Sequence, residues 1–329
     1  MRAIIVSFFL IFSTLSFADE NADIAYQTAL KYEKNGNFKE AMIWYKKAAT
    51  TTLHVPQKQD DIISFGKNSI EGSDDNATND TLERIIFSSF DIKPYNSNYL
   101  LPFTYDFNTK GGRSNSETKF QLSFKKQLGS NILGMHEKLY LGYTQISWWQ
   151  TSQSSSPFRE TNYQPEIFIE FPYIYDYTAL KGYVIGLLHE SNGRSVPYSR
   201  SWNRVYLKAA FQYKDSFIVP RIWYRLPEKT KSSPLQSSGD DNPDIDEFLG
   251  YGDLRIVYPY GVNLFSLLVR NNLRFNAQNK GAVEFDWTFP VRSIKDMYGK
   301  LYYFNGYGDS LIDYDKKVQR IGLGFAITR

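Results

Sequence analysis

From residue 98 to the C-terminus, the chain repeats one pattern of hydrophobic and polar positions. Runs of about ten residues alternate apolar and polar side chains, and Gly, Asn, Ser, Asp or Pro separates one run from the next. This alternation, repeated over many short segments, is typical of a membrane β-barrel. The pattern predicts strands at 98–106, 116–127, 137–149, 164–175, 180–191, 202–213, 216–225, 247–258, 262–272, 281–289, 299–306 and 318–328.

These segments predict an all-β fold, an antiparallel transmembrane β-barrel of about twelve strands, with a short helical hairpin before it. The connections between the strands alternate between long and short. Because the long connections of bacterial barrels face outward and the short ones face the periplasm, the alternation also predicts the orientation of the barrel. The long connections are 107–115, 150–163, 192–201, 226–246, 273–280 and 307–317.

The segment before the barrel divides into three parts. Arg2, an apolar run from Ala3 to Leu15 and the small-x-small sequence Ser16-Phe17-Ala18 are typical of a secretory signal peptide. The apolar run is short for a membrane span, although an N-terminal anchor is the alternative. The predicted division is a signal peptide at 1–18, a helical hairpin at 19–50, a linker leading into the barrel at 51–97, and the barrel with the catalytic site at 98–329.

Residues 22–50 carry apolar positions at helical spacing on both sides of a turn at Lys34-Asn35-Gly36-Asn37. The pattern resembles a single tetratricopeptide or Sel1-like repeat, which cannot bury its own apolar face. The segment is therefore either a docking element for a periplasmic partner or a hairpin that is only appended to the barrel, and the second interpretation is slightly favoured.

Composition supports export and a barrel. The 329 residues carry a net charge of +3, which is too balanced to indicate nucleic-acid binding. Aromatic residues make up 17% of the chain, with 25 Tyr and 24 Phe, as two aromatic girdles require. The chain contains no Cys, which excludes disulfides and metal–thiolate sites.

The candidate chemistry lies at the outer end of the strand at 180–191. His189 and Ser191 are two residues apart, so they share one face of the strand, and Asn203 begins the next strand. A serine, a histidine and an orienting amide are the parts of a nucleophilic triad. The alternative is an ordinary histidine at a strand end followed by a Ser-Asn-Gly turn. The other two histidines, His54 and His136, have no comparable serine beside them.

Parity along the strands indicates which side the candidate triad faces. The side chains that share a face with His189 and Ser191 are larger and more apolar than those at the alternate positions of the strand. This difference indicates that His189 and Ser191 face the lipid. On the next strand, Asn203 shares parity with apolar residues, whereas Arg204 and Lys208 occupy the alternate positions, which suit a polar lumen. Polar side chains that face lipid are costly and indicate function.

Several motifs in the same order resemble the bacterial outer membrane phospholipase A family, over about residues 95–328. The residues that carry the resemblance are Tyr143-Thr144-Gln145, Ser147-Trp148-Trp149-Gln150, 155–163, the HxSNGRS…SRSWNR segment from His189 to Arg204, 240–245 and 308–314.

The resemblance implies a calcium-dependent hydrolase in the bacterial outer membrane, with its active site toward the outer leaflet. Its substrates would be membrane phospholipids and lysophospholipids, cleaved at their sn-1 and sn-2 acyl esters, and it would be active as a homodimer. By resemblance, Ser191 is the nucleophile, His189 the base and Asn203 the orienting group, and the Gly193 amide is the candidate oxyanion donor.

The resemblance also implies a calcium (Ca2+) site and a dimer interface. The Arg194 carbonyl and the Ser199 hydroxyl would bind the ion, and Ser155 from the partner's loop would complete the site. Gln145 matches the polar residue buried at the family's dimer interface. A second calcium site of the family uses an aspartate where this chain has Val196, so the sequence leaves that site open.

The alternative function is a non-enzymatic outer-membrane barrel, either a narrow pore or an adhesin. A pore would gain nothing from a serine–histidine pair outside its lumen, and about twelve strands leave little room for a wide channel. The sequence therefore favours the enzyme.

Overall fold

The computed structural model describes residues 20–50, 92–109, 114–172, 179–233, 235–291, 294 and 296–329. The chain divides into two compact units, Met1–Phe90 and Asp91–Arg329. The predicted signal peptide at 1–18 and most of the predicted linker at 51–97 lie outside the described residues. Among the described residues, no helix combines the length and the apolar character needed to cross a membrane.

The described part of the first unit is a hairpin of two helices, α2 (Glu20–Lys34) and α3 (Phe38–Thr50), in the segment where the sequence predicts one. The small side chains of Ala25, Ala29 and Ala41 are buried, which lets the two helices approach each other closely. The Tyr45 hydroxyl donates to Glu33 at 2.5 Å and links the helices further.

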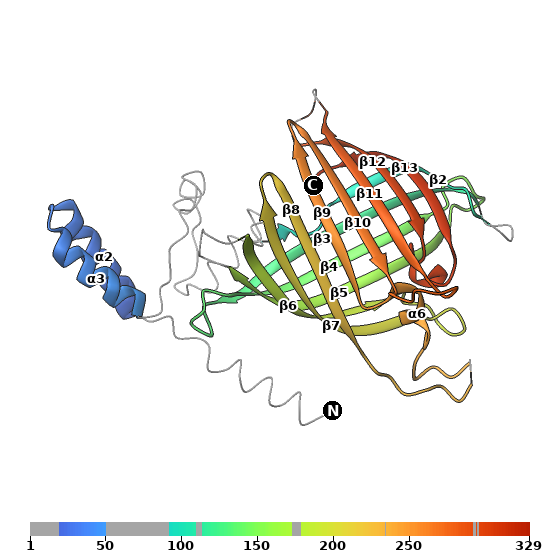
Figure 1. Cartoon of the computed structure of the whole chain (residues 1–329), viewed down its shortest axis with the longest axis horizontal. Coiled ribbons are helices and arrows are strands. Elements are labelled where there is room, and N and C mark those ends of the chain that lie inside the picture. Colours follow the sequence, from blue (N-terminus) through green and yellow to red (C-terminus); the bar gives the residue numbers. More distant parts are fainter. Residues whose placement is uncertain are drawn as a thin grey trace, which may run out of the picture. The chain divides into compact units, whose positions relative to one another are not determined.

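The second unit is a closed β-barrel, which confirms the predicted fold class (Figure 1). Twelve strands, β2 to β13, pair antiparallel in chain order, and the pairing of β3 with β4 and of β13 with β2 completes the ring. The strands are β2 (Tyr99–Asp106), β3 (Ser116–Ser130), β4 (Lys138–Trp149), β5 (Phe158–Pro172), β6 (Leu180–Ser191), β7 (Ser201–Tyr213), β8 (Ser216–Leu226), β9 (Gly252–Tyr260), β10 (Asn263–Asn271), β11 (Gly281–Pro290), β12 (Tyr298–Gly306) and β13 (Val318–Ala326).

Most predicted strand boundaries agree with the structure within about three residues, but two strands differ more. β5 begins at Phe158 rather than 164, because Phe158–Tyr163 continues the pairing with the end of β4. β9 begins at Gly252 rather than 247, because the residues before it form the short helix α6 (Ile245–Leu249). Ile245 and Leu249 are buried, so these apolar positions serve a helix and not a strand.

The barrel unit also includes residues that the sequence analysis placed in the linker. A short strand, β1 (Ile92–Pro94), pairs with β3 beyond the end of β2. Tyr95 then stacks on Phe168 with ring centroids 5.0 Å apart. Asn98 accepts the Ser123 amide at 2.6 Å and donates to the Thr328 hydroxyl at 3.0 Å, which joins the two ends of the barrel.

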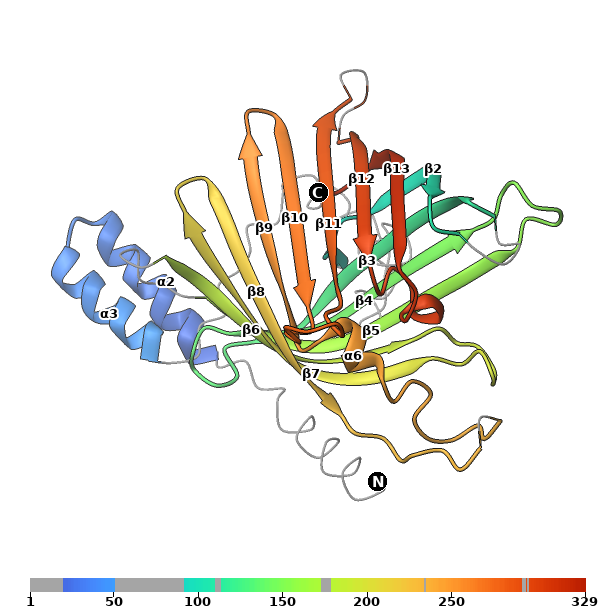
Figure 2. The same ribbon diagram turned by 45° about the vertical axis from the view of Figure 1, so that its right-hand side comes forward.

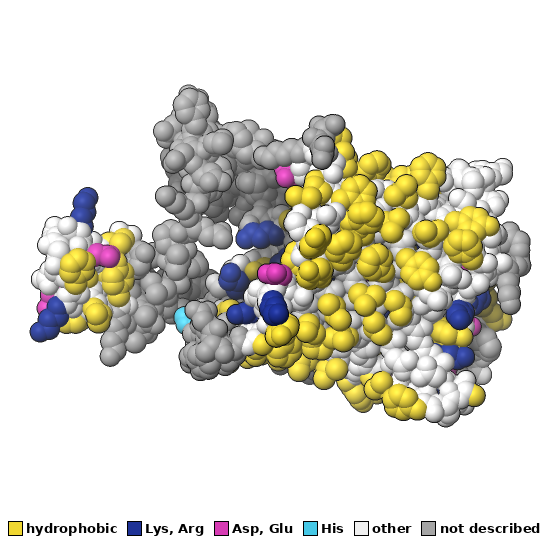
Figure 3. All heavy atoms as spheres, turned by 45° about the horizontal axis from the view of Figure 1, so that its top comes forward, with side chains coloured by type: hydrophobic (Ala, Val, Ile, Leu, Met, Phe, Trp, Pro, Cys, Tyr) yellow, Lys and Arg dark blue, Asp and Glu magenta, His cyan; other side chains and the backbone are white. Residues whose placement is uncertain are grey.

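The outer wall of the barrel is apolar. Figure 3 shows hydrophobic side chains in a broad yellow band over the strands, as a lipid-facing belt requires. The band includes exposed residues from many strands: Phe103, Leu122, Phe124, Leu141, Ile185, Leu187, Leu207, Ile222, Tyr224, Tyr258, Val269, Leu323 and Phe325.

The interior of the barrel is polar and contains many ion pairs. Lys119 contacts Asp309 at 2.9 Å, and Arg320 contacts Asp309 at 3.1 Å and Glu117 at 3.0 Å. Burial alone would raise the pKa of Asp309, but the charges of Lys119 and Arg320 hold it well below its usual range.

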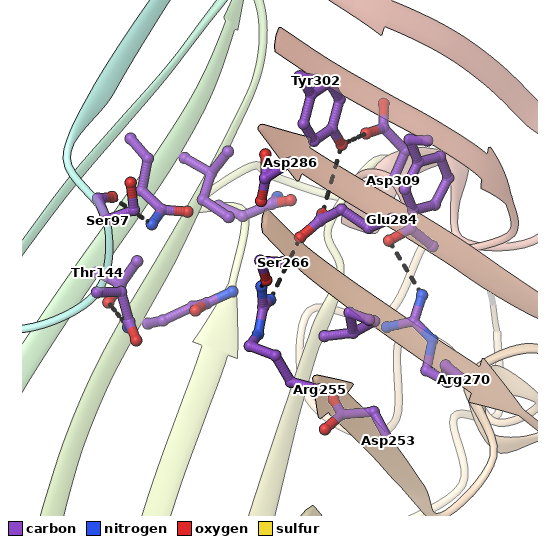
Figure 4. A pocket seen from close by; sticks show the side chains of 18 of the residues that line it. Ser97, Thr144, Asp253, Arg255, Ser266, Arg270, Glu284, Asp286, Tyr302 and Asp309 are labelled. Carbon is purple, nitrogen blue, oxygen red and sulfur yellow. Dashed lines mark hydrogen bonds and ion pairs between the residues drawn. The ribbon is translucent and has the colours of Figure 1, made fainter. Parts of the chain in front are cut away.

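The lumen retains a cavity of about 460 Å³. Figure 4 shows Glu284 of β11 linked on one side to Arg255 of β9 and on the other side to Tyr302 of β12. Charged side chains that pair with one another therefore occupy the described part of the lumen.

Candidate active site

The candidate triad lies at the end of the barrel that carries the long connections. β6 ends at Ser191, the connection 192–200 follows, and β7 begins at Ser201. The connections after β4, β8 and β12 lie at the same end, and Figure 2 shows α6 there. The antiparallel register places His189 directly opposite Asn203, and Ser191 opposite Ser201.

The structure brings His189 and Asn203 into direct contact. His189 Nδ1 lies 2.8 Å from Asn203 Oδ1. Because an amide oxygen can only accept a hydrogen bond, this geometry assigns the proton to Nδ1 and leaves Nε2 free as an acceptor. Ser191 lies two residues further along the same face of β6, at the strand end.

The faces of β6 follow the predicted parity. Ile185, Leu187 and His189 are exposed on the outside, whereas Leu188 and Glu190 line the cavity in the lumen. The candidate chemistry therefore lies on the lipid-facing wall, outside the charged interior.

A carboxylate on the inner face supports the strands behind the triad. Glu190 accepts hydrogen bonds from Arg204 at 2.5 Å, from the Trp202 indole at 2.9 Å and from Gln164 at 2.8 Å. These bonds tie β5, β6 and β7 together immediately behind His189. Glu190 was not among the predicted site residues. Its position between His189 and Ser191 on the strand indicates that its side chain faces the lumen.

The connection after Ser191 is organised by Asn192, which is buried. Its side-chain oxygen accepts the amides of Arg194 at 3.3 Å and Arg200 at 3.0 Å, and its Nδ2 donates to the Tyr198 carbonyl at 2.9 Å. Gly193 has φ of +63°, and a Cβ there would lie 3.1 Å from the Tyr163 ring. The positive φ therefore favours glycine at the candidate oxyanion donor, and the Tyr163 ring leaves little space for a larger residue.

Two of the three residues expected to hold calcium lie in this same connection. Arg194 Nε lies 3.2 Å from Glu160, and its guanidinium also contacts the Arg159 carbonyl. The Ser199 hydroxyl donates to Asp241 at 2.6 Å, which leaves the hydroxyl oxygen able to accept a cation. A neutral carbonyl and a hydroxyl are oxygen donors that suit this hard cation.

The third expected ligand, Ser155, lies in the connection between β4 and β5, where it is exposed with φ of +62°. Within the described ranges, the hydrogen bonds and ion pairs of the Arg194 and Ser199 side chains go to Glu160, Arg159 and Asp241, and not to Ser155. No group of three or more acidic, histidine or cysteine side chains that could hold a metal occurs in the described part of the chain.

Asp241 belongs to the acidic connection where a second cation site remains open. The Asp241 carboxylate contacts the Lys231 ammonium as well as the Ser199 hydroxyl. Its charge is therefore already balanced within the chain, and the residues present do not favour a second calcium ion.

Gln145, the expected interface residue, lies within a row of polar side chains on the outer face of β4. Its Oε1 accepts a hydrogen bond from the Tyr143 hydroxyl at 2.9 Å, and its Nε2 donates one to the Ser147 hydroxyl at 3.2 Å. Such a polar row facing lipid is costly unless another surface covers it.

The sequence and the fold match one family. The profile of the family described as Phospholipase A1 matches residues 78–327. Phospholipase A1 from Klebsiella pneumoniae is 38% identical over 251 residues, which cover 72% of this chain and 82% of that protein. A relative from Neisseria meningitidis is 35% identical over 260 residues, and these cover 71% of this chain and 64%, just under two thirds, of that relative.

Solved structures agree. Outer membrane phospholipase A from Escherichia coli matches with a TM-score of 0.65 and 34% identity, over 72% of this chain and 92% of that chain. An outer membrane phospholipase dimer from Salmonella typhi, solved with bound calcium, matches with a TM-score of 0.65 and 35% identity, over the same shares. The chain is therefore a β-barrel of the bacterial outer membrane and belongs to the phospholipase A1 family.

Proposed function

We propose that this chain is a calcium-dependent phospholipase of the outer membrane that hydrolyses the sn-1 and sn-2 acyl esters of phospholipids and lysophospholipids. One observation carries the proposal: His189 is hydrogen-bonded to Asn203 on the lipid-facing wall, on the same strand face as Ser191. A serine nucleophile there meets the ester region of a lipid without the lipid leaving the membrane.

The reaction follows from the positions of the three side chains. The Ser191 hydroxyl oxygen attacks the acyl carbonyl carbon while His189 Nε2 takes the hydroxyl proton. Asn203 Oδ1 accepts a hydrogen bond from the Nδ1–H group and holds the imidazole ring in this tautomer, while the proton stays on Nδ1. The imidazolium then protonates the leaving glycerol oxygen, and the acyl group remains bonded to Ser191. Water, deprotonated by His189, releases the fatty acid and restores the serine.

The Gly193 amide is the proposed donor to the developing oxyanion. Arg194 and Ser199 would hold calcium at the same connection, and bound calcium would supply positive charge beside this oxyanion. Ser155 of a second copy would complete the ligand set, since Ser155 lies in the connection after β4 and Arg194 and Ser199 lie in the connection after β6. This arrangement agrees with a homodimer as the active form, with Gln145 covered at its interface.

The orientation of the site is part of the proposal. His189, Ser191 and Asn203 lie at the barrel end with the long connections, which faces the cell exterior in bacterial barrels. The active site would therefore act on the outer leaflet. The pore alternative gives no role to His189, Ser191 and Asn203, because these side chains lie on the outer wall and not in the lumen.

Release of fatty acid from mixed detergent–phospholipid micelles tests the proposal. We expect hydrolysis in calcium and loss of hydrolysis in chelator. A long-chain sulfonyl fluoride should modify Ser191, and peptide mapping should place the label there. Labelling at another serine, or unchanged turnover of Ser191→Ala, would exclude this triad.

A further inference from the structure

A carboxylate from the connection that follows β8 touches the candidate triad. Asn203 Nδ2 donates a hydrogen bond to Glu228 Oε1 at 3.0 Å. Glu228 lies two residues beyond the end of β8, and Leu226, the last residue of β8, pairs directly with Asn203. Tyr224 and Leu226 are exposed on the outer wall. Glu228 continues this row, so its side chain is on the same side of the barrel as His189.

The backbone beside Glu228 is fixed by the connection that follows β8. The Lys229 carbonyl accepts the Asp240 amide at 2.8 Å, and Arg225 binds the Asp240 carboxylate at 2.6 Å. Glu228 itself is half-buried. The carboxylate therefore has a defined place next to Asn203 and is not a side chain extended freely into solvent.

The chemistry of the two groups gives this contact a consequence. An amide side chain has a donor end and an acceptor end of nearly the same shape, and it can present either end to a neighbour. An ionised carboxylate has no proton and can only accept. With Glu228 on one side, Asn203 must turn its NH2 group toward the carboxylate and its oxygen toward His189. The histidine must then carry its proton on Nδ1, which leaves Nε2 free for the serine proton.

We propose that Glu228 is a positioning residue for the reaction, and that the functional row is Ser191–His189–Asn203–Glu228 across β6, β7 and the end of β8. This inference rests on the proposed function. Glu228 touches neither the substrate nor the reacting atoms; it acts through Asn203, whose orientation it fixes and whose amide it polarises. The row supplies a negative charge behind the imidazolium, which Asn203 alone does not carry.

The test replaces the carboxylate with its isosteric amide. Glu228→Gln keeps the size of the side chain but can present either end to Asn203, so the amide of Asn203 is no longer held in one orientation. We expect kcat to fall about tenfold with KM nearly unchanged, because an aligned hydrogen bond to a charged group is lost at a distance from the substrate. The rate of Ser191 modification by a sulfonyl fluoride should fall in parallel. If Glu228 had only a structural role, any fall in these two rates would come with a change in circular dichroism or in thermal unfolding. A fall in both rates with circular dichroism and thermal unfolding unchanged therefore supports the positioning role.

A double-mutant cycle shows whether Glu228 acts through Asn203. In an Asn203→Ala background, Glu228→Gln should change kcat less than twofold, because the connecting amide is already absent. The matched control is Glu247→Gln, which removes a glutamate that pairs with Arg274 at 3.3 Å and lies in α6. This control should retain wild-type kcat.

Two results would overturn the inference: wild-type kcat in Glu228→Gln, or the same fold loss with and without Asn203. Either result would leave the proposed function intact if Ser191→Ala is inactive. If Ser191→Ala itself remains active, the proposed function fails first, so the two failures are distinguishable.

Discussion

The backbone conformation of Gly193 predicts that one substitution will reduce the activity of the enzyme far more than the stability of the barrel. Gly193→Ala adds a Cβ at φ of +63°, and this atom would lie 3.1 Å from the Tyr163 ring. A non-glycine residue in the left-handed region costs about 1–2 kcal/mol. The contact can be relieved by the exposed Tyr163 side chain, but the strain of the positive φ can be relieved only by moving the backbone that carries the Gly193 amide.

The expected effect on activity is larger than the effect on stability. If the Gly193 amide donates to the oxyanion, its displacement removes one such donor, which typically costs about 100-fold in kcat. The free energy of unfolding should fall only by the backbone strain, about 1–2 kcal/mol. The assays are steady-state hydrolysis of micellar phospholipid and chemical unfolding in detergent.

Gly261→Ala is the matched control. Gly261 also has a positive φ, of +56°, but lies in the turn between β9 and β10 and has no atom within 4 Å of the added Cβ. It should lose similar stability and keep full activity. Near-normal kcat in Gly193→Ala, or an equal loss in both variants, would refute the assignment of the oxyanion donor.

The remaining predictions concern the triad, the metal and the lumen. Ser191→Ala should abolish hydrolysis while the barrel folds normally, whereas Asn203→Ala should retain weak activity, because it removes only the orienting group; equal loss in both would mean that Asn203 does more than orient. By linkage, calcium and dimerisation should strengthen each other by the same factor, and Ser155→Ala should reduce that factor, which analytical ultracentrifugation in calcium and in chelator measures. Dimers indifferent to calcium would contradict this. Because the charges of Lys119 and Arg320 lower the pKa of Asp309, its stabilising contribution is complete above about pH 4 and is lost as the pH falls further. Acid unfolding should therefore be less steep in Asp309→Asn, and an unchanged pH dependence would argue against this ion pair as its source.

The sequence by itself determined the barrel, its strand count and the face that carries the candidate chemistry. These properties follow from the two-residue repeat of a β-strand. Whether a residue is odd or even in the strand fixes the side of the barrel wall that its side chain faces, whichever strand is paired beside it. His189 and Asn203 could be assigned to the lipid side on this basis, and the structure places them there in contact. The motifs also identified the family before any geometry was known.

The tertiary structure decided the contacts between connections and the secondary structure of segments that have no alternating pattern. α6 formed where a strand was expected, since Ile245 and Leu249 find a buried environment only once the barrel has closed around it. Glu228 lies 25 residues from Asn203 in sequence, within a connection that has no periodic pattern, and only the register of β7 against β8 brings them together. The hydrogen bond of Ser199 to Asp241 has the same origin, because it joins the connection after β6 to the connection after β8. Contacts between loops depend on how the strands are aligned across the barrel, and the local sequence pattern carries no information about that alignment.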